Sequence, residues 1–132
     1  MIALDTNVLV RLLVNDPAEK NQIDTIKYLC HGVDFLYISQ IVQVETVWVL
    51  ESAYSFDKQS VIRAMEHINS HTFFKLQAPQ LFNEALSLFK TSNAGFSDCL
   101  ILVESLKQQA PLATFDKKLG NLSGTQLLSS KQ

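Results

Sequence analysis

The stretch IALDTNVLVRLL, residues 2–13, joins a short apolar run to a helical pattern through one aspartate. Residues 2–4 are apolar and Asp5 follows them, which indicates a short buried strand with a carboxylate at its carboxyl end. Behind it, Val8, Leu9 and Leu12 recur at the spacing of one face of a helix. The stretch therefore predicts a strand that runs directly into a helix.

The same alternation of strand and helix continues along the chain. Helices are predicted over 6–14, 17–30, 40–54, 57–70, 79–90 and 96–109, with a helical turn at 116–119. Strands are predicted at 2–5, 35–39, 72–76, 111–115 and 125–129. Strands that alternate with helices indicate an α/β fold, in which helices cover both faces of a parallel sheet.

Length and composition limit the class of protein. The 132 residues predict a single domain, 1–132, and a content of 47% apolar and 18% charged residues is typical of a globular chain. No apolar run approaches the roughly 20 residues that span a membrane, and no basic segment precedes the first apolar stretch. We therefore expect a cytoplasmic protein without a membrane segment. A net charge of −2 argues against a large, sequence-blind nucleic-acid surface and allows a nuclease with a small footprint.

Four carboxylates stand where a site could form. Asp5 and Asp116 each follow a predicted strand, and the carboxyl ends of parallel strands meet at one edge of a sheet. Asp98 lies in the first turn of a predicted helix. Each of these three residues has a structural alternative, because aspartate commonly caps a helix or favours its positive end.

Glu45 lies in the most apolar predicted helix. Its neighbours one turn away include Ile41, Trp48 and Val49, so we expect its carboxylate on a buried apolar face. No Lys or Arg lies within two turns of Glu45, and an unpaired buried carboxylate is costly. If all four acids share one sheet edge, they repel one another, and a divalent cation would relieve this repulsion. Oxygen ligands suit Mg²⁺ or Mn²⁺, which can activate a water molecule and offset charge on a phosphodiester.

Four motifs then resemble those of the PIN-domain ribonucleases. They are IALDTNVLVRLL, VETVWVL, GFSDCLILVESL and LATFDKKL, in order along nearly the whole chain, and they look most like the VapC-type toxins of bacterial toxin–antitoxin pairs. The resemblance implies a three-layer α/β/α sandwich with a central parallel sheet. It also implies metal-dependent endonucleolytic cleavage of RNA, a homodimer and an inhibiting antitoxin protein. The catalytic and metal-binding set implied by the motifs is Asp5, Glu45, Asp98 and Asp116.

Other positions of the motifs carry secondary expectations. Asn7 and Thr114 match polar residues that support the first and last acids of the family. Gly95 stands where many relatives carry a further acid, which weakens the expectation of a second metal ion. Arg11, Lys117 and Lys118 are candidate contacts for RNA phosphates, or charges on a solvated face.

Two other functions remain open at this point. The chain could be a catalytically inactive PIN-like module that binds RNA or protein. It could also be an Mg²⁺-binding phosphoacceptor domain, which is a likeness of fold alone. Such domains place an acidic pair near the end of the first strand, where this sequence has only Asp5.

Overall fold

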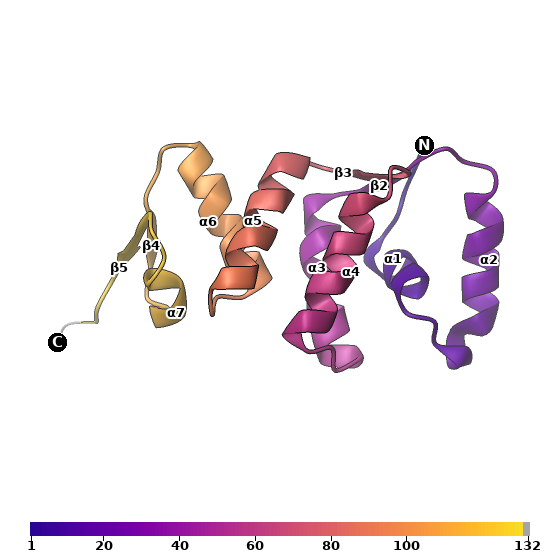
Figure 1. Cartoon of the computed structure of the whole chain (residues 1–132), viewed down its shortest axis with the longest axis horizontal. Coiled ribbons are helices and arrows are strands. Elements are labelled where there is room, and N and C mark those ends of the chain that lie inside the picture. Colours follow the sequence, from indigo (N-terminus) through magenta and orange to yellow (C-terminus); the bar gives the residue numbers. More distant parts are fainter. Residues whose placement is uncertain (131–132) are drawn as a thin grey trace. The chain divides into compact units, whose positions relative to one another are not determined.

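The computed structural model describes residues 1–130 and divides into two compact units at Gln77 and Ala78 (Figure 1). Every strand pairing in both units is parallel, within a three-stranded sheet in the first unit and a two-stranded sheet in the second. Helices alternate with these strands along the chain. The predicted α/β class with parallel strands is therefore confirmed.

The first unit contains the sheet β1-β2-β3 and most of the helices. Its strands pair in register, with Ile2 opposite Leu36 and Leu36 opposite Phe74. The elements in chain order are β1 (Ile2–Ala3), α1 (Thr6–Leu13), the 3₁₀ helix η1 (Pro17–Glu19), α2 (Lys20–Cys30), β2 (Leu36–Ile38), α3 (Gln40–Ala53), α4 (Lys58–Ser70) and β3 (Phe74–Leu76).

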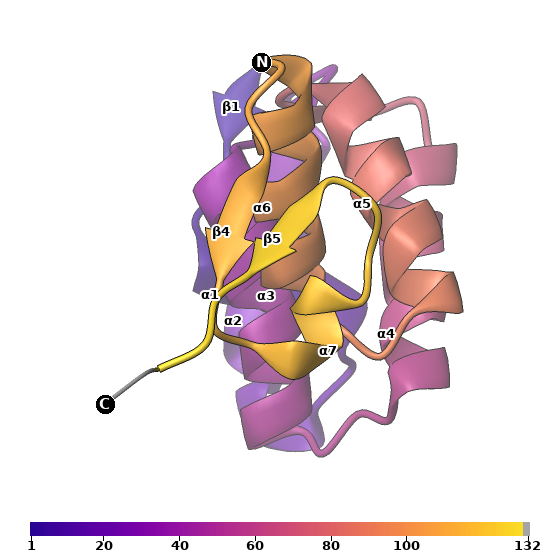
Figure 2. The ribbon, with the colours of Figure 1, turned by 90° about the vertical axis from the view of Figure 1, so that its left-hand side faces the viewer.

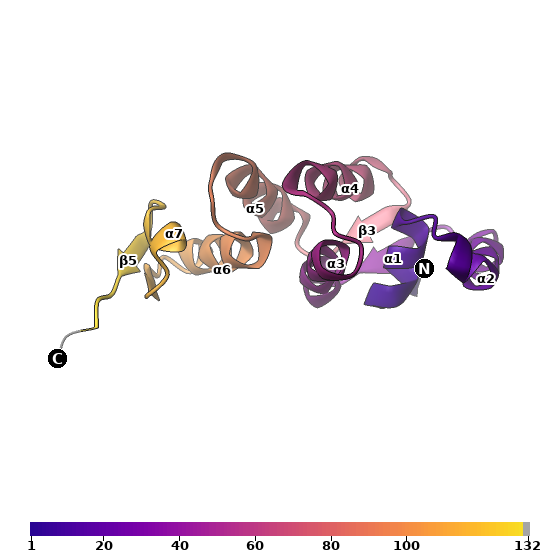
Figure 3. The ribbon, with the colours of Figure 1, turned by 90° about the horizontal axis from the view of Figure 1, so that it is seen from below.

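In the core of this unit, α1 packs against α3. Helix α4 packs against strand β3 of the sheet. Helices α3 and α4 lie side by side, as the end-on view in Figure 3 shows. Burial of apolar side chains of this kind is the main favourable term in folding. The apolar residues of this unit with no accessible surface are Leu9, Val10, Ile38, Leu50, Val61, Met65 and Ile68.

Three of the α-helices in this unit begin directly after a residue whose side chain caps the helix. Asp5, Ser39 and Asp57 accept hydrogen bonds from the backbone N–H groups of Val8, Val42 and Ser60, respectively. Such caps satisfy N–H groups that the helix itself leaves unpaired. The capping alternative considered for Asp5 is therefore confirmed, and a cap can also serve a second role.

The second unit is a pair of helices followed by a small sheet. Its elements are α5 (Pro79–Thr91), α6 (Phe96–Lys107), β4 (Leu112–Thr114), α7 (Lys117–Gly120) and β5 (Thr125–Leu127). Figure 2 shows β4 and β5 side by side next to α6, with α7 close to both strands. The rings of Phe82 and Phe89 meet Phe96 edge-on, at centroid distances of 5.7 and 6.0 Å.

Replacing Phe82 with alanine should destabilise the second unit by about 3–5 kcal/mol, because Phe82 is fully buried and its loss leaves a cavity. Urea unfolding measures this free energy. The matched control is Phe115→Ala, since 66% of the Phe115 side chain is exposed and the change should cost less than about 0.5 kcal/mol. Equal costs for the two variants would contradict the packing described here.

The predicted elements are all present, and their ends differ by a few residues. Residues 17–19 form a 3₁₀ turn rather than the start of an α-helix, and the strand predicted at 72–76 is limited to Phe74–Leu76. Differences of this size are usual at the ends of elements, where hydrogen bonding is partial. None of the helices within residues 1–130 is both long and apolar enough to cross a membrane.

Candidate active site

Asp5 and Glu45 are connected in the first unit through Thr6. The Asp5 carboxylate follows β1, and its Oδ1 accepts a hydrogen bond from the Val8 N–H at 3.0 Å. The next residue, Thr6, donates its hydroxyl to Oε1 of Glu45 at 2.9 Å. The first turn of α1 therefore orients both acids. The Val8 N–H holds the Asp5 carboxylate, and the Thr6 hydroxyl holds the Glu45 carboxylate of α3.

The expectation that Glu45 lies on a buried face is wrong. Glu45 is exposed, and the side chains one turn away, Ile41 and Trp48, are 72% and 66% exposed. Helix α3 is apolar on more than one side, and it buries the opposite side, which carries Val47 and Leu50. The apolar pattern therefore could not show which face would be covered. The Glu45 carboxylate is paired with the Thr6 hydroxyl, from which it accepts a hydrogen bond.

Asp98 and Asp116 lie in the second unit, each at the start of a helix. Asp98 is half-buried in the first turn of α6, where the positive end of the helix favours a carboxylate. Oδ1 of Asp116 accepts from the Leu119 N–H at 3.0 Å and so caps α7. The backbone N–H of Asp116 donates to the Thr114 hydroxyl, also at 3.0 Å, so Thr114 holds the turn that carries this acid.

The donor chemistry of these acids fits a hard divalent cation. Asp5, Glu45 and Asp116 each use one carboxylate oxygen in the bonds above, and the other oxygen makes no hydrogen bond within residues 1–130. None of the four acids forms an ion pair in the same range. In neither unit, over those residues, do three or more carboxylate, histidine or cysteine side chains gather into a metal cluster. Within the described residues, each unit thus has carboxylate oxygens without partners, and neither unit by itself contains a completed metal site.

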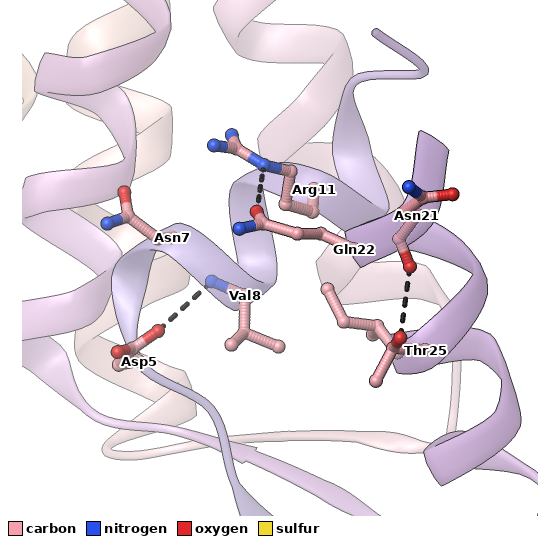
Figure 4. A pocket seen from close by; sticks show the side chains of 8 residues that line it. Asp5, Asn7, Val8, Arg11, Asn21, Gln22 and Thr25 are labelled. Carbon is pink, nitrogen blue, oxygen red and sulfur yellow. Dashed lines mark hydrogen bonds between the residues drawn. The ribbon is translucent and has the colours of Figure 1, made fainter. Parts of the chain in front are cut away.

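A pocket of about 460 Å³ opens beside Asp5, between α1 and α2 (Figure 4). Asp5, Asn7 and Arg11 line it from α1 and the residue before it, while Asn21 and Gln22 line it from α2. The predicted accessory residue Asn7 therefore faces the same cavity as Asp5.

The three candidate RNA-contacting cations differ in their surroundings. Arg11 is only 18% exposed, and its guanidinium donates to Gln22 Oε1 at 3.0 Å and to the Tyr54 hydroxyl at 3.2 Å. It also lies 3.6 Å from a carboxylate oxygen of Glu19. Lys117 and Lys118 are exposed on α7, directly after Asp116.

The chain matches a known protein family over most of its length. The family model described as PIN domain matches residues 2–124, a range that includes all four acids. The chain belongs to the PIN-domain family. The α/β fold and the motif resemblance both agree with this membership.

A PIN-domain relative supports the predicted branch of the family. The chain is 27% identical over 128 residues to a protein named VapC ribonuclease from Aquifex aeolicus (strain VF5), and the match covers 91% of this chain and 93% of the relative. This match confirms the resemblance to VapC-type PIN ribonucleases. No solved structure matches the chain significantly.

The sequence patterns missed several polar residues around the PIN-domain acids. Thr6, which holds Glu45, carries a clear local signal because it adjoins Asp5 and begins α1. Asn21, Gln22 and Thr25 line the pocket from α2, and their spacing alone is equally typical of a solvent-exposed helix face.

Proposed function

We propose that this PIN-domain protein is a metal-dependent endoribonuclease and the toxin of a toxin–antitoxin pair. The observation that carries the proposal is the PIN-domain match over residues 2–124, which contains an acid at each of the four motif positions. The similarity to a protein named VapC ribonuclease supports RNA as the substrate and a toxin role.

Asp5, Glu45, Asp98 and Asp116 are proposed to hold one Mg²⁺ or Mn²⁺ in the active protein, which acts as a single domain of residues 1–132. Their free oxygens and lack of cationic partners within residues 1–130 support this role. When bound, such an ion supplies an activated water nucleophile and offsets charge on the phosphodiester.

The chain's own residues position these ligands. Thr6 restrains the Glu45 carboxylate, and the helix cap fixes the direction of the Asp5 carboxylate. Thr114 holds the backbone that carries Asp116. Hydrogen bonds to ligating side chains typically determine how well a metal site is formed.

The partners follow from the same proposal. Lys117 and Lys118 are exposed beside Asp116 and are proposed to contact RNA phosphates. Arg11 lines the pocket beside Asp5 and is proposed to contribute to RNA binding there. We also propose a homodimer, inhibition by a cognate antitoxin protein and a cytoplasmic location. Exposed apolar side chains such as Trp48 and Phe73, at 66% and 42%, are available for these protein contacts.

The direct test incubates the purified protein with a mixed single-stranded RNA pool in Mg²⁺. The wild type should cleave internal phosphodiester bonds, and Asp98→Asn should be inactive while its circular dichroism spectrum is unchanged. A folded Asp98→Asn variant with wild-type activity would remove Asp98 from the site. Metal binding without cleavage of any RNA would instead indicate an inactive binding module.

Replacing Thr6 with valine should weaken the metal site without unfolding the protein. Valine keeps the shape of threonine but loses the hydroxyl that holds Glu45, so the Mn²⁺ concentration for half-maximal cleavage should rise about 10–100-fold. Thr6→Ser should retain most of the wild-type response. The matched control is Thr91→Val, because within residues 1–130 the Thr91 hydroxyl bonds only to the Ser87 carbonyl of its own helix. An unchanged Mn²⁺ response in Thr6→Val would contradict this role.

A further inference from the structure

The pocket beside Asp5 carries an inference about how substrate is selected. We propose that it receives one unpaired nucleotide of the RNA, next to the phosphate that is cut, and that amide side chains of α2 read its base. This inference rests on the proposed ribonuclease function. It adds Asn21 and Gln22 as specificity-determining residues.

The position of the pocket connects it to the acidic residues. Asp5 and Asn7 form one wall, and the side chains of α2 form the other (Figure 4). Its volume of about 460 Å³ lies within the range of small-molecule sites. A nucleotide bound there would place its phosphate near the Asp5 carboxylate, where the proposed chemistry occurs.

The lining has the chemistry of a base-binding site. Val8 and Ile26 supply apolar surface for the flat face of a base. The amide groups of Asn7 and Asn21 make no hydrogen bond within residues 1–130, so both donors and acceptors are available. Asn and Gln amides pair bidentately with adenine through its N6 and N7 atoms. These side chains therefore favour an adenine over the other bases.

The Gln22 amide is held in one orientation before any ligand binds. Its Oε1 accepts from Nε of Arg11 at 3.0 Å, which leaves its NH₂ group directed away from Arg11. Arg11 is in turn held by the Tyr54 hydroxyl at 3.2 Å and lies 3.6 Å from Glu19. Such preorganisation lowers the entropic cost of binding. Arg11 is thus a positioning residue for Gln22.

A structural role explains the bonds of Arg11. The bonds of Arg11 tie α1 to α2, to η1 and to Tyr54 at the end of α3, and they would stabilise the unit without any ligand. They do not involve Asn7 and Asn21, whose exposed amides line the same cavity and have no partner within residues 1–130. A base with a polar edge would find these amides accessible, beside a Gln22 side chain that Arg11 already orients.

The experiment maps cleavage sites of the full-length protein on a randomised single-stranded RNA pool in Mn²⁺. The wild type should prefer adenine at one position beside the cut, and Asn21→Ala and Gln22→Ala should each reduce that preference about 10-fold, the usual worth of one amide–base pair. Their KM for the preferred RNA should rise, and their Mn²⁺ requirement should stay the same. Gln59→Ala, an exposed change on α4, is the matched control.

The positioning role of Arg11 needs a readout other than stability. Arg11→Lys keeps the charge and loses the planar guanidinium, so it should broaden the base preference while the Mn²⁺ requirement is unchanged. Thermal unfolding of each variant separates this effect from a loss of folding.

Three results would overturn the inference. Wild-type base preference and KM in both Asn21→Ala and Gln22→Ala would show that the pocket does not read RNA, while the ribonuclease function would stand. Unchanged RNA cleavage with weaker inhibition by the antitoxin would assign the pocket to a protein partner instead. A wild type that binds Mn²⁺ but neither binds nor cleaves RNA would overturn the proposed function itself, and this inference with it.

Discussion

Replacing Asp5 with asparagine should reduce RNA cleavage by roughly 100-fold or more and leave the fold intact. Loss of a group that merely supports a metal ligand costs about 10–100-fold, and loss of the ligand itself should cost at least as much. The free energy of unfolding should change little, because the side-chain oxygen of asparagine can accept the same hydrogen bond from the Val8 N–H by which Asp5 caps α1. Asparagine caps helices about as well as aspartate. Initial cleavage rates and urea unfolding, measured on the same preparation, test both parts.

The chain contains a matched control for this variant. Asp57 caps α4 in the same way, with its Oδ1 accepting from the Ser60 N–H at 2.8 Å. This bond holds the pKa of Asp57 below its ordinary value, so Asp57→Asn should lose a little stability at neutral pH and keep full activity. Equal loss of cleavage in Asp5→Asn and Asp57→Asn would show that the effect comes from capping rather than chemistry.

Removing divalent metal should stop cleavage altogether. The proposed ligands are carboxylates, so EDTA should abolish activity, and added Mg²⁺ or Mn²⁺ should restore it. Mn²⁺ should also raise the unfolding temperature of the wild type, because an ion that binds only the folded state stabilises it. The rise should be absent or smaller in Asp5→Asn. Cleavage that persists in metal-free buffer, with no metal detected in the protein, would contradict the four-carboxylate site.

Local interactions made much of this molecule predictable from the sequence. The helices that follow Asp5 and Asp116 begin at residues whose cap the sequence indicates, because each cap bonds to an N–H only three residues away. Pro79 likewise stands at the first residue of α5. The four acidic motifs were visible for the same reason, since each is a short pattern of neighbouring residues.

The environment of Glu45 could not be predicted in this way. Helix α3 has apolar residues on several sides, and only packing against α1 and α4 determines that Val47 and Leu50 are buried while Trp48 is exposed. Hydrophobic periodicity reports which faces could be buried, and an all-round apolar helix offers more than one. The buried-carboxylate argument for Glu45 therefore failed, although the family resemblance to which its motif contributed is confirmed.

The sequence by itself determined the order of strands and helices, the caps and the four candidate acids, because these depend on residues within a few positions of one another. Tertiary structure decided the Thr6–Glu45 hydrogen bond, which joins residues 39 apart, and the pocket that α1 and α2 form around Arg11 and Gln22. These features require distant segments to pack in one particular arrangement. Which polar groups meet is then set by the packing of the whole unit, and no local pattern contains that information.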